Sequence, residues 1–149
     1  MIIKINNKNK EITNKIRDVF QASYAVEAKL LNTIDFPPLS RKVSQFINSN
    51  SEFYAYYQSN DIIGIVEVKN QQELTHIQSL VVDPKHFRKG IGRKLIQFTL
   101  EKDITKVFNV ETGLKNTPAL KLYESFNFKE EKQWNTNHGV RKVRFKKIK

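Results

Sequence analysis

One segment, residues 77–95, constrains what this chain can fold into and bind more than any other stretch does. An apolar run at residues 77–82 is stopped at Pro84, and a basic loop containing Gly90 and Gly92 then opens a helical pattern. The first amides of a helix lack partners, and the helix dipole places about half a positive charge there. Glycine removes the side chains that would keep an anion away from the backbone. The segment therefore predicts an anion site at a strand-to-helix junction.

Four basic side chains surround this loop: Arg88, Lys89, Arg93 and Lys94. Together with the free amides they would suit a pyrophosphate. The chain lacks the GxxxxGK(S/T) loop of nucleoside triphosphatases, and Leu95 stands where the dinucleotide fingerprint needs its third glycine. An ordinary strand-to-helix turn with solvated lysines is the alternative that the local sequence leaves open.

Hydrophobic spacing predicts a mixed order of elements. Strands are expected at residues 2–6, 53–57, 62–68, 77–82, 107–112, 128–134 and 140–148. Helices are expected at 11–21, near 26–31, near 43–47, after the glycine loop, and from 117 onward. The central strand–helix–strand unit requires a right-handed parallel crossover, and its flanks favour antiparallel pairs. We expect an α+β fold: a mixed, mostly antiparallel sheet with a central parallel βαβ crossover and helices on both faces. No linker or repeat divides the chain, so one domain is expected over residues 1–149.

Composition excludes several kinds of site. The absence of cysteine excludes disulfides, zinc–cysteine sites and an acyl-cysteine intermediate. His76, His86 and His138 lack metal-ligand spacing, so we expect no metal. No apolar run approaches the ~20 residues of a membrane span, and the N-terminus does not resemble a signal peptide. We therefore expect a cytoplasmic protein without a membrane partner.

The formal net charge of +11 favours a phosphate-bearing partner. Basic residues cluster at 85–94 and 141–149 but also spread along the whole chain, so ordinary solvated lysines explain the charge equally well. The sequence contains no helix-turn-helix, ribonucleoprotein or zinc-finger motif, and alternating basic residues on a last strand also protect a sheet edge. A nucleic-acid-binding protein stays an alternative, although we expect no nucleic-acid partner.

The glycine loop resembles the acetyl-CoA pyrophosphate loop of the GNAT acetyltransferase superfamily. Gly90 and Gly92 match the small positions of the family pattern (Q/R)-x-x-G-x-(G/A). Phe87 departs from the polar first position, and Arg88 is displaced by one residue. This departure from the pattern would affect one side-chain contact with the pyrophosphate and would leave the backbone amides of the loop available to it.

A second segment, residues 116–128, resembles the family pattern N-x-x-A-x-x-L-Y-x-x-x-G-F. The matching positions are Asn116, Ala119, Leu122, Tyr123 and Phe128. Asn127 replaces the glycine, and asparagine enters the left-handed region more easily than most residues. With two motifs in the correct order and spacing, the chain is identified as a member of the superfamily, with the weakest resemblance before residue 50.

The resemblance implies an acyl-CoA-dependent N-acetyltransferase that moves an acetyl group directly from acetyl-CoA to an amine. The cofactor-binding residues that it implies are Leu80, Val81, Val82, Arg88, Lys89, Gly90, Ile91, Gly92, Arg93, Lys94 and Asn116. The backbone of residues 80–82 would face the pantetheine arm at a splay between two strands, and an amide there would polarise the thioester carbonyl. Asn116 would either order the arm or only cap the following helix.

Tyr123 is the implied general acid, because a phenol with a pKa of about 10 stays protonated at neutral pH and can donate to a thiolate. A half-buried structural tyrosine is the alternative. Glu67 and His76 are candidate bases for the amine, Glu111 is a further one, and a base acting through water is also open. Residues 24–39, which include Glu27, would form the acceptor cleft.

Three questions stay open at the level of sequence. The acceptor could be a small amine, an amino acid, a peptide N-terminus or a lysine. A CoA-binding sensor or interaction module without catalysis is compatible with the same motifs. Members of the family often form dimers, so a homodimer is also open.

Overall fold

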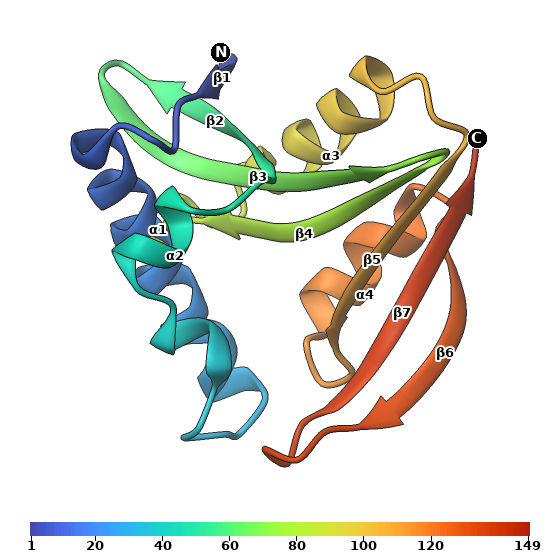
Figure 1. Cartoon of the computed structure of the whole chain (residues 1–149). Coiled ribbons are helices and arrows are strands. Elements are labelled where there is room, and N and C mark those ends of the chain that lie inside the picture. The colour runs from blue at the N-terminus through green and yellow to red at the C-terminus, as the bar shows by residue number, and fades with distance from the viewer.

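The computed structural model describes residues 1–149 as one seven-stranded sheet with helices on both faces (Figure 1). The strands are β1 (Ile2–Ile5), β2 (Glu52–Gln58), β3 (Asp61–Gln71), β4 (Leu74–Val82), β5 (Val107–Gly113), β6 (Lys129–Asn135) and β7 (Arg141–Ile148). Their order across the sheet is β1-β2-β3-β4-β5-β7-β6, and β4–β5 is the only parallel pair. The predicted mixed sheet with a central parallel crossover is therefore confirmed. β3 and β4 are longer than expected, because their hairpin continues through polar residues that carry no apolar pattern.

The helices are α1 (Lys10–Leu30), α2 (Val43–Ile47), α3 (Ile91–Lys102) and α4 (Thr117–Ser125), with 3-10 turns at Pro37–Ser40 and Pro84–His86. The predicted division of the first helical region into two pieces is wrong. The sequence between residues 21 and 26 contains no Gly or Pro breaker, and α1 continues through it. Asn9 begins the helix by accepting a hydrogen bond from the Ile12 amide.

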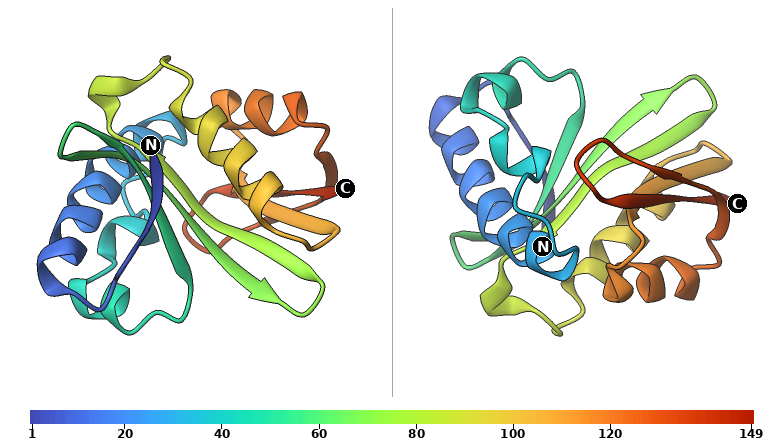
Figure 2. Two further views of the ribbon diagram at one scale, coloured as in Figure 1. Left: turned by 90° about the horizontal axis from the view of Figure 1, so that it is seen from above. Right: turned by 90° about the horizontal axis from the view of Figure 1, so that it is seen from below.

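Helices cover both faces of the sheet (Figure 2), and each face carries its own hydrophobic core. On one face α3 and α4 pack Leu95, Ile96 and Tyr123 against the sheet, where Ile77 and Phe108 are also buried. On the other face Ile16 and Phe20 of α1 pack with sheet residues such as Phe53, Ile65 and Val81. Burial on both sides explains why β3 reads as a continuous apolar run.

The parallel strands β4 and β5 separate part-way along their length. They are paired only from Leu74–Val107 to Ile77–Val110. Gln78 lies at a bulge, because Glu67 pairs with Ser79 while Val68 pairs with Ile77. Bulges bend a strand and often lie beside active sites. Figure 1 shows the resulting V between the arm that holds α1 and β4 and the arm that holds β5, α4 and β7.

No helix of this chain has the length and apolar character needed to cross a lipid bilayer. No group of three or more His, Cys, Asp or Glu side chains lies in an arrangement that could hold a metal ion.

Candidate active site

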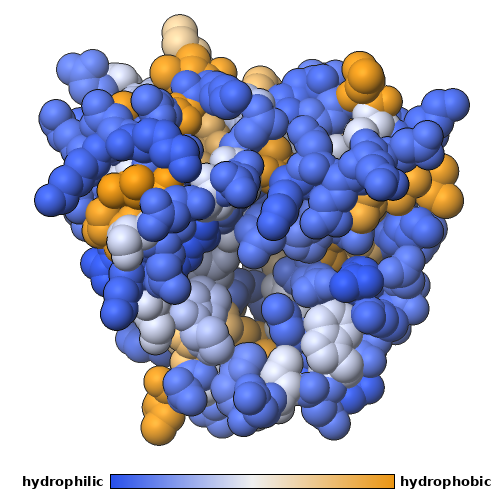
Figure 3. All heavy atoms as spheres, in the orientation of Figure 1, coloured by the Kyte–Doolittle hydropathy of each residue, from blue (hydrophilic) through white to orange (hydrophobic).

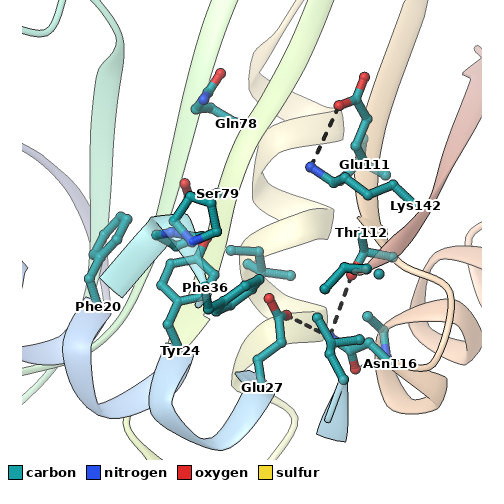
Figure 4. Close-up of a pocket in the computed structure, with 18 of the residues that line it drawn as sticks. Phe20, Tyr24, Glu27, Phe36, Gln78, Ser79, Glu111, Thr112, Asn116 and Lys142 are labelled. Carbon is teal, nitrogen blue, oxygen red and sulfur yellow. Dashed lines mark hydrogen bonds and ion pairs between the residues drawn. The ribbon is translucent and has the colours of Figure 1, made fainter. Parts of the chain in front are cut away.

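A cavity of about 540 Å³ lies between the two arms of the V. The surface is hollowed there in Figure 3, and Figure 4 shows the side chains that line it. α1 and the loop after it supply one wall, with Tyr24, Glu27 and Phe36. β4, β5, α4 and β7 supply the others, with Ser79, Leu80, Thr112, Asn116, Tyr123 and Lys142. Aromatic rings and a few polar groups thus converge in one space, as is common in ligand sites.

The glycine loop presents an unusual run of free amides. None of the backbone N–H groups of residues 88–93 donates a hydrogen bond to another protein group. Arg88 (φ 64°) and Gly90 (φ 76°) are both left-handed, and Gly90 is the N-cap of α3. A Cβ placed on Gly90 would meet no atom within 4 Å, so this side of the loop is open. Successive free amides at a helix N-terminus form a cradle for an anion.

The four basic side chains of the loop divide into two pairs. Arg93 donates to Ser125 Oγ at 2.9 Å and stacks on the Phe126 ring. Lys94 lies over the Tyr56 ring, with its nitrogen 5.5 Å from the centroid. Arg88 and Lys89 are exposed and belong to no ion pair. Arg93 and Lys94 are also exposed and outside any ion pair, and Lys89 Nζ lies 3.4 Å from His86 Nδ1, so all four side chains lie at the surface beside the loop.

Strand β4 offers a free edge to the cavity. Beyond Ile77 none of its residues pairs with β5, so its backbone polar groups on that side are available to a ligand. Leu80 lines the cavity, whereas the Val81 side chain is buried on the α1 face. The Val82 amide donates to Ser23 Oγ at 3.4 Å. Leu80, Val81 and Val82, which the sequence predicted to bind the cofactor, therefore have different surroundings. The Leu80 side chain lines the cavity, the Val81 side chain is buried on the other face, and the Val82 amide already has a partner.

Tyr123 lies on the inner face of α4 and reaches the cavity. Its side chain is 4% exposed, and its ring packs against Phe128 and Phe145 at centroid distances of 5.8 and 6.2 Å. Burial raises the pKa of the phenol above its usual value, and the charges of Glu27 and Tyr24 raise it further. The phenol therefore keeps its proton throughout the neutral range.

Glu27 lines the cavity within the segment 24–39, where the sequence predicted the acceptor cleft without assigning Glu27 a role of its own. Its Oε1 accepts a hydrogen bond of 2.6 Å from Asn116 Nδ2. Burial raises the pKa of the Glu27 carboxyl to about 6, while the Asn116 hydrogen bond and the charge of Lys142 act in the opposite direction. Asn116 also caps α4, because its Oδ1 accepts from the Ala119 amide. The capping role of Asn116 is thus present, and a role toward a cofactor stays a prediction.

The two predicted bases, Glu67 and His76, do not line the cavity. Glu67 is 1% exposed; Arg41 donates to both of its oxygens at 2.8 and 2.9 Å, and Ser51 donates at 2.5 Å. His76 Nδ1 lies 2.5 Å from Asn109 Oδ1, where β4 and β5 are still paired. A catalytic role for either residue stays a prediction.

Glu111, the further candidate, does line the cavity. Its Oε2 accepts from Arg144 at 2.5 Å, and Lys142 lies 4.0 Å from its other oxygen. The Glu111 carboxylate is therefore matched by two basic neighbours.

Comparisons with known proteins give a matching family model and a curated relative. The family model described as "Acetyltransferase (GNAT) domain" matches residues 26–149. UPF0157 protein YqkA of Bacillus subtilis (strain 168) is 31% identical over 142 residues, which cover 94% of this chain and 41% of that protein. The chain thus spans about two fifths of the length of this curated relative.

Two solved structures share the fold. The PaiA N-acetyltransferase of Thermoplasma acidophilum, in complex with coenzyme A, superposes with a TM-score of 0.80 at 16% identity, covering 100% of this chain and 98% of that one. The ribosomal-protein-S18-alanine N-acetyltransferase of Escherichia coli gives a TM-score of 0.77 at 18% identity, covering 99% and 92%. At this level of identity the likeness concerns the fold.

Proposed function

Because this chain belongs to the GNAT acetyltransferase family, we propose that it transfers the acetyl group of acetyl-CoA to an amine. The observation that carries the proposal is the run of free amides at residues 88–93, which lies beside the unpaired edge of β4. Acetyl-CoA has a pyrophosphate for the amides and an extended pantetheine arm for the strand edge. The structural neighbour that was solved with coenzyme A supports a CoA ligand for this fold.

The loop has the features that a pyrophosphate needs. Its amides are free, the space beyond Gly90 is open, and the exposed cations Arg88 and Lys89 lie on the same turn. Ile91, Gly92 and the backbones of Arg93 and Lys94 continue the cradle into the first turn of α3. Hydrogen bonds to charged groups contribute about 1.5–3 kcal/mol each, so several such amides would dominate cofactor binding.

The free edge of β4 would position the acyl end of the ligand. Bound acetyl-CoA supplies an activated acetyl group as a thioester. An amide of Leu80 or Val81 would donate to the thioester carbonyl oxygen and stabilise the negative charge that develops there. A preorganised donor of this kind contributes about 2.7–4 kcal/mol to the transition state.

Tyr123 would serve as the general acid. Its phenol lines the cavity and keeps its proton at neutral pH, because burial raises its pKa. Because a thiol has a lower ordinary pKa than a phenol, the proton would pass to sulfur in step with the breaking of the carbon–sulfur bond. Asn116 holds the start of α4, and hence Tyr123, against the cavity wall.

Calorimetric titration with acetyl-CoA tests the proposal, with 3′-dephospho-CoA and ATP as comparators. We expect saturable binding of about one acetyl-CoA per chain and much weaker binding of ATP, because ATP cannot occupy the strand edge. Thiol release in the presence of an amine panel would then establish transfer. If acetyl-CoA fails to bind at moderate salt, the proposed function is wrong.

A further inference from the structure

One of the charged side chains that line the cavity belongs to no ion pair. The charged side chains that line it are Glu27, Arg41, Glu111 and Lys142. Arg41 is neutralised by the buried Glu67, and Glu111 is paired with Arg144 and lies 4.0 Å from Lys142. Glu27 has no basic group within ion-pair distance. In a chain of net charge +11, a carboxylate inside this cleft that belongs to no ion pair favours a cationic ligand.

The Glu27 carboxylate is held in place from the opposite arm. α1 carries Glu27, and Asn116 at the start of α4 donates to its Oε1 at 2.6 Å across the V (Figure 4). Its second oxygen has no hydrogen-bond partner within the protein. The rings of Tyr24 and Phe36, which meet edge to face at 5.7 Å, line the same cavity. A cation at Glu27 would therefore lie among aromatic rings, which favour it further.

Contacts between the arms close one end of this cleft. Leu31 packs in one cluster with Ala28, Phe36 and Val140, and it lies directly on Gly113. The Thr33 hydroxyl donates to the His138 carbonyl at 3.4 Å. These contacts join the region after α1 to β5 and to the turn between β6 and β7. A compact acceptor fits this bounded space, whereas an extended chain would have no exit at that end.

We infer that Glu27 binds the acceptor as an ammonium ion and accepts its proton, and that the acceptor is a compact monoamine with an apolar or aromatic body. The inference rests on the proposed function. A single unpaired carboxylate matches a single ammonium, and the positive charge of the rest of the protein disfavours polycations.

In the proposed reaction, each bond that forms is matched by a bond that breaks. An N–H bond of the ammonium breaks, and the proton moves to Glu27. The freed lone pair forms a bond to the acetyl carbonyl carbon, the carbon–sulfur bond breaks, and sulfur takes the phenolic proton of Tyr123. The surplus proton on the new amide nitrogen returns to the Tyr123 phenolate, and Glu27 releases its proton to water. The products are the amide, free CoA and one proton.

Several polar and charged groups face Glu27, and they set the pH range of this step. Tyr24 lies on the same helix, Asn116 and Tyr123 on α4, and Lys142 on β7. Burial, opposed by Asn116 and Lys142, leaves the pKa of Glu27 at about 6. The carboxylate is therefore ionised at neutral pH yet basic enough to take a proton during turnover.

Direct binding of a probe amine tests the inference without depending on activity. 2-Phenylethylamine and its neutral isostere 2-phenylethanol are titrated into the wild-type protein and into Glu27→Gln at neutral pH. We expect wild type to bind the amine at least about tenfold more tightly than the alcohol, and Glu27→Gln to lose that preference. Glutamine keeps an oxygen that can accept from Asn116 Nδ2, so the variant should fold. Asp18→Asn is the matched control, because it removes an exposed carboxylate from the same helix.

The other possible binding results would each contradict either this inference or the proposed function. If Glu27→Gln keeps the amine preference, or if wild type binds neither probe, the inference is wrong. Titration of the same samples with acetyl-CoA separates the two proposals. If wild type binds the amine through Glu27 but does not bind acetyl-CoA, the proposed function falls and the amine site stands. If acetyl-CoA binds but Glu27 is irrelevant to the amine, only the inference falls.

Discussion

Leu31 and Gly113 lie so close together that the two arms of the fold have no room for a Cβ between them. A Cβ placed on Gly113 would lie 2.7 Å from Leu31 Cδ1 and closer still to Cδ2. Leu31 follows α1, and Gly113 ends β5, so this contact fixes the width of the closed end of the cleft. The glycine serves close packing here and not an unusual backbone angle.

Gly113→Ala should therefore strain the closed end of the cleft. We expect a loss of about 1–3 kcal/mol in the free energy of unfolding, because the added methyl overpacks a buried contact. Urea denaturation measures it. In a Leu31→Ala background the same substitution should cost much less, since the methyl then has space. An equal cost in both backgrounds would show that the Leu31 contact does not decide the effect.

The Arg41–Glu67 pair fastens the loop after α1 to the sheet. Arg41→Met should lower the free energy of unfolding by about 3–5 kcal/mol, because it leaves the buried Glu67 carboxylate without its partner. The double variant Arg41→Met/Glu67→Gln should recover much of this loss, since no charge is then stranded. Denaturant titration of wild type, Arg41→Met and the double variant measures the three free energies of unfolding. A double variant no more stable than Arg41→Met would show that the stranded Glu67 charge does not cause the loss.

Most of the fold could be predicted from local patterns in the sequence. Sequence patterns predicted all seven strands, β3 as a continuous apolar run and β7 by alternation, and the glycine loop marked the start of α3. The interruption predicted near residue 21 is wrong because α1 continues past the core-facing stripe of Ile16, Val19 and Phe20 to Tyr24 and Glu27, which line the cavity. Helix continuity there depends on the absence of Gly and Pro.

In the candidate site, too, local sequence patterns predict some residues and miss the contacts between distant ones. Tyr123 and the loop lie within short motifs and could be located from sequence. The Glu27–Asn116 hydrogen bond joins residues 89 positions apart, and the Arg41–Glu67 pair joins residues 26 apart. No local pattern encodes either contact, because both depend on how the arms meet. The pairing of Glu67 with Arg41 and the absence of an ion pair at Glu27 therefore required the structure.

Gly92 can be probed with two sizes of side chain. A Cβ at this position would lie 3.5 Å from Leu122 Cδ2, an ordinary contact, so Gly92→Ala should keep acetyl-CoA affinity. Gly92→Val adds two methyl groups beside the free amides of α3 and should weaken acetyl-CoA binding by at least about tenfold. Calorimetry on both variants, with circular dichroism to verify folding, measures the difference. Equal affinities for the two variants would count against the loop as the cofactor site.

Tyr123→Phe removes one hydroxyl from the cavity and leaves the ring packing intact. We expect kcat to fall by about 10²-fold or more with little change in acetyl-CoA affinity, because a general acid acts mainly in the transition state. Tyr56→Phe is the control, since its hydroxyl contacts Lys94 outside the cavity. An unchanged kcat, with an amine for which chemistry limits the rate, would exclude the acid role.

Glu27→Gln should change stability in a pH-dependent way. The pKa of Glu27 is about 6 in the folded protein against an ordinary value of 4.5, so the folded state binds the proton more tightly. Stability from this group is fully present below pH 4.5 and is lost as pH rises through 6. The loss amounts to about 2 kcal/mol, and it disappears in Glu27→Gln, which cannot ionise.

The variant should therefore be more stable than wild type above the folded pKa and nearly equal to it below the unfolded one. Urea denaturation at about pH 7.5 and about pH 4 measures both differences, with Asp18→Asn as the control for the change in net charge. Equal stabilities at both pH values would mean that burial imposes no cost on the ionised Glu27. A cost at neutral pH would instead show that the fold keeps an unpaired carboxylate at the expense of its own stability, as expected for a group retained to bind a cation.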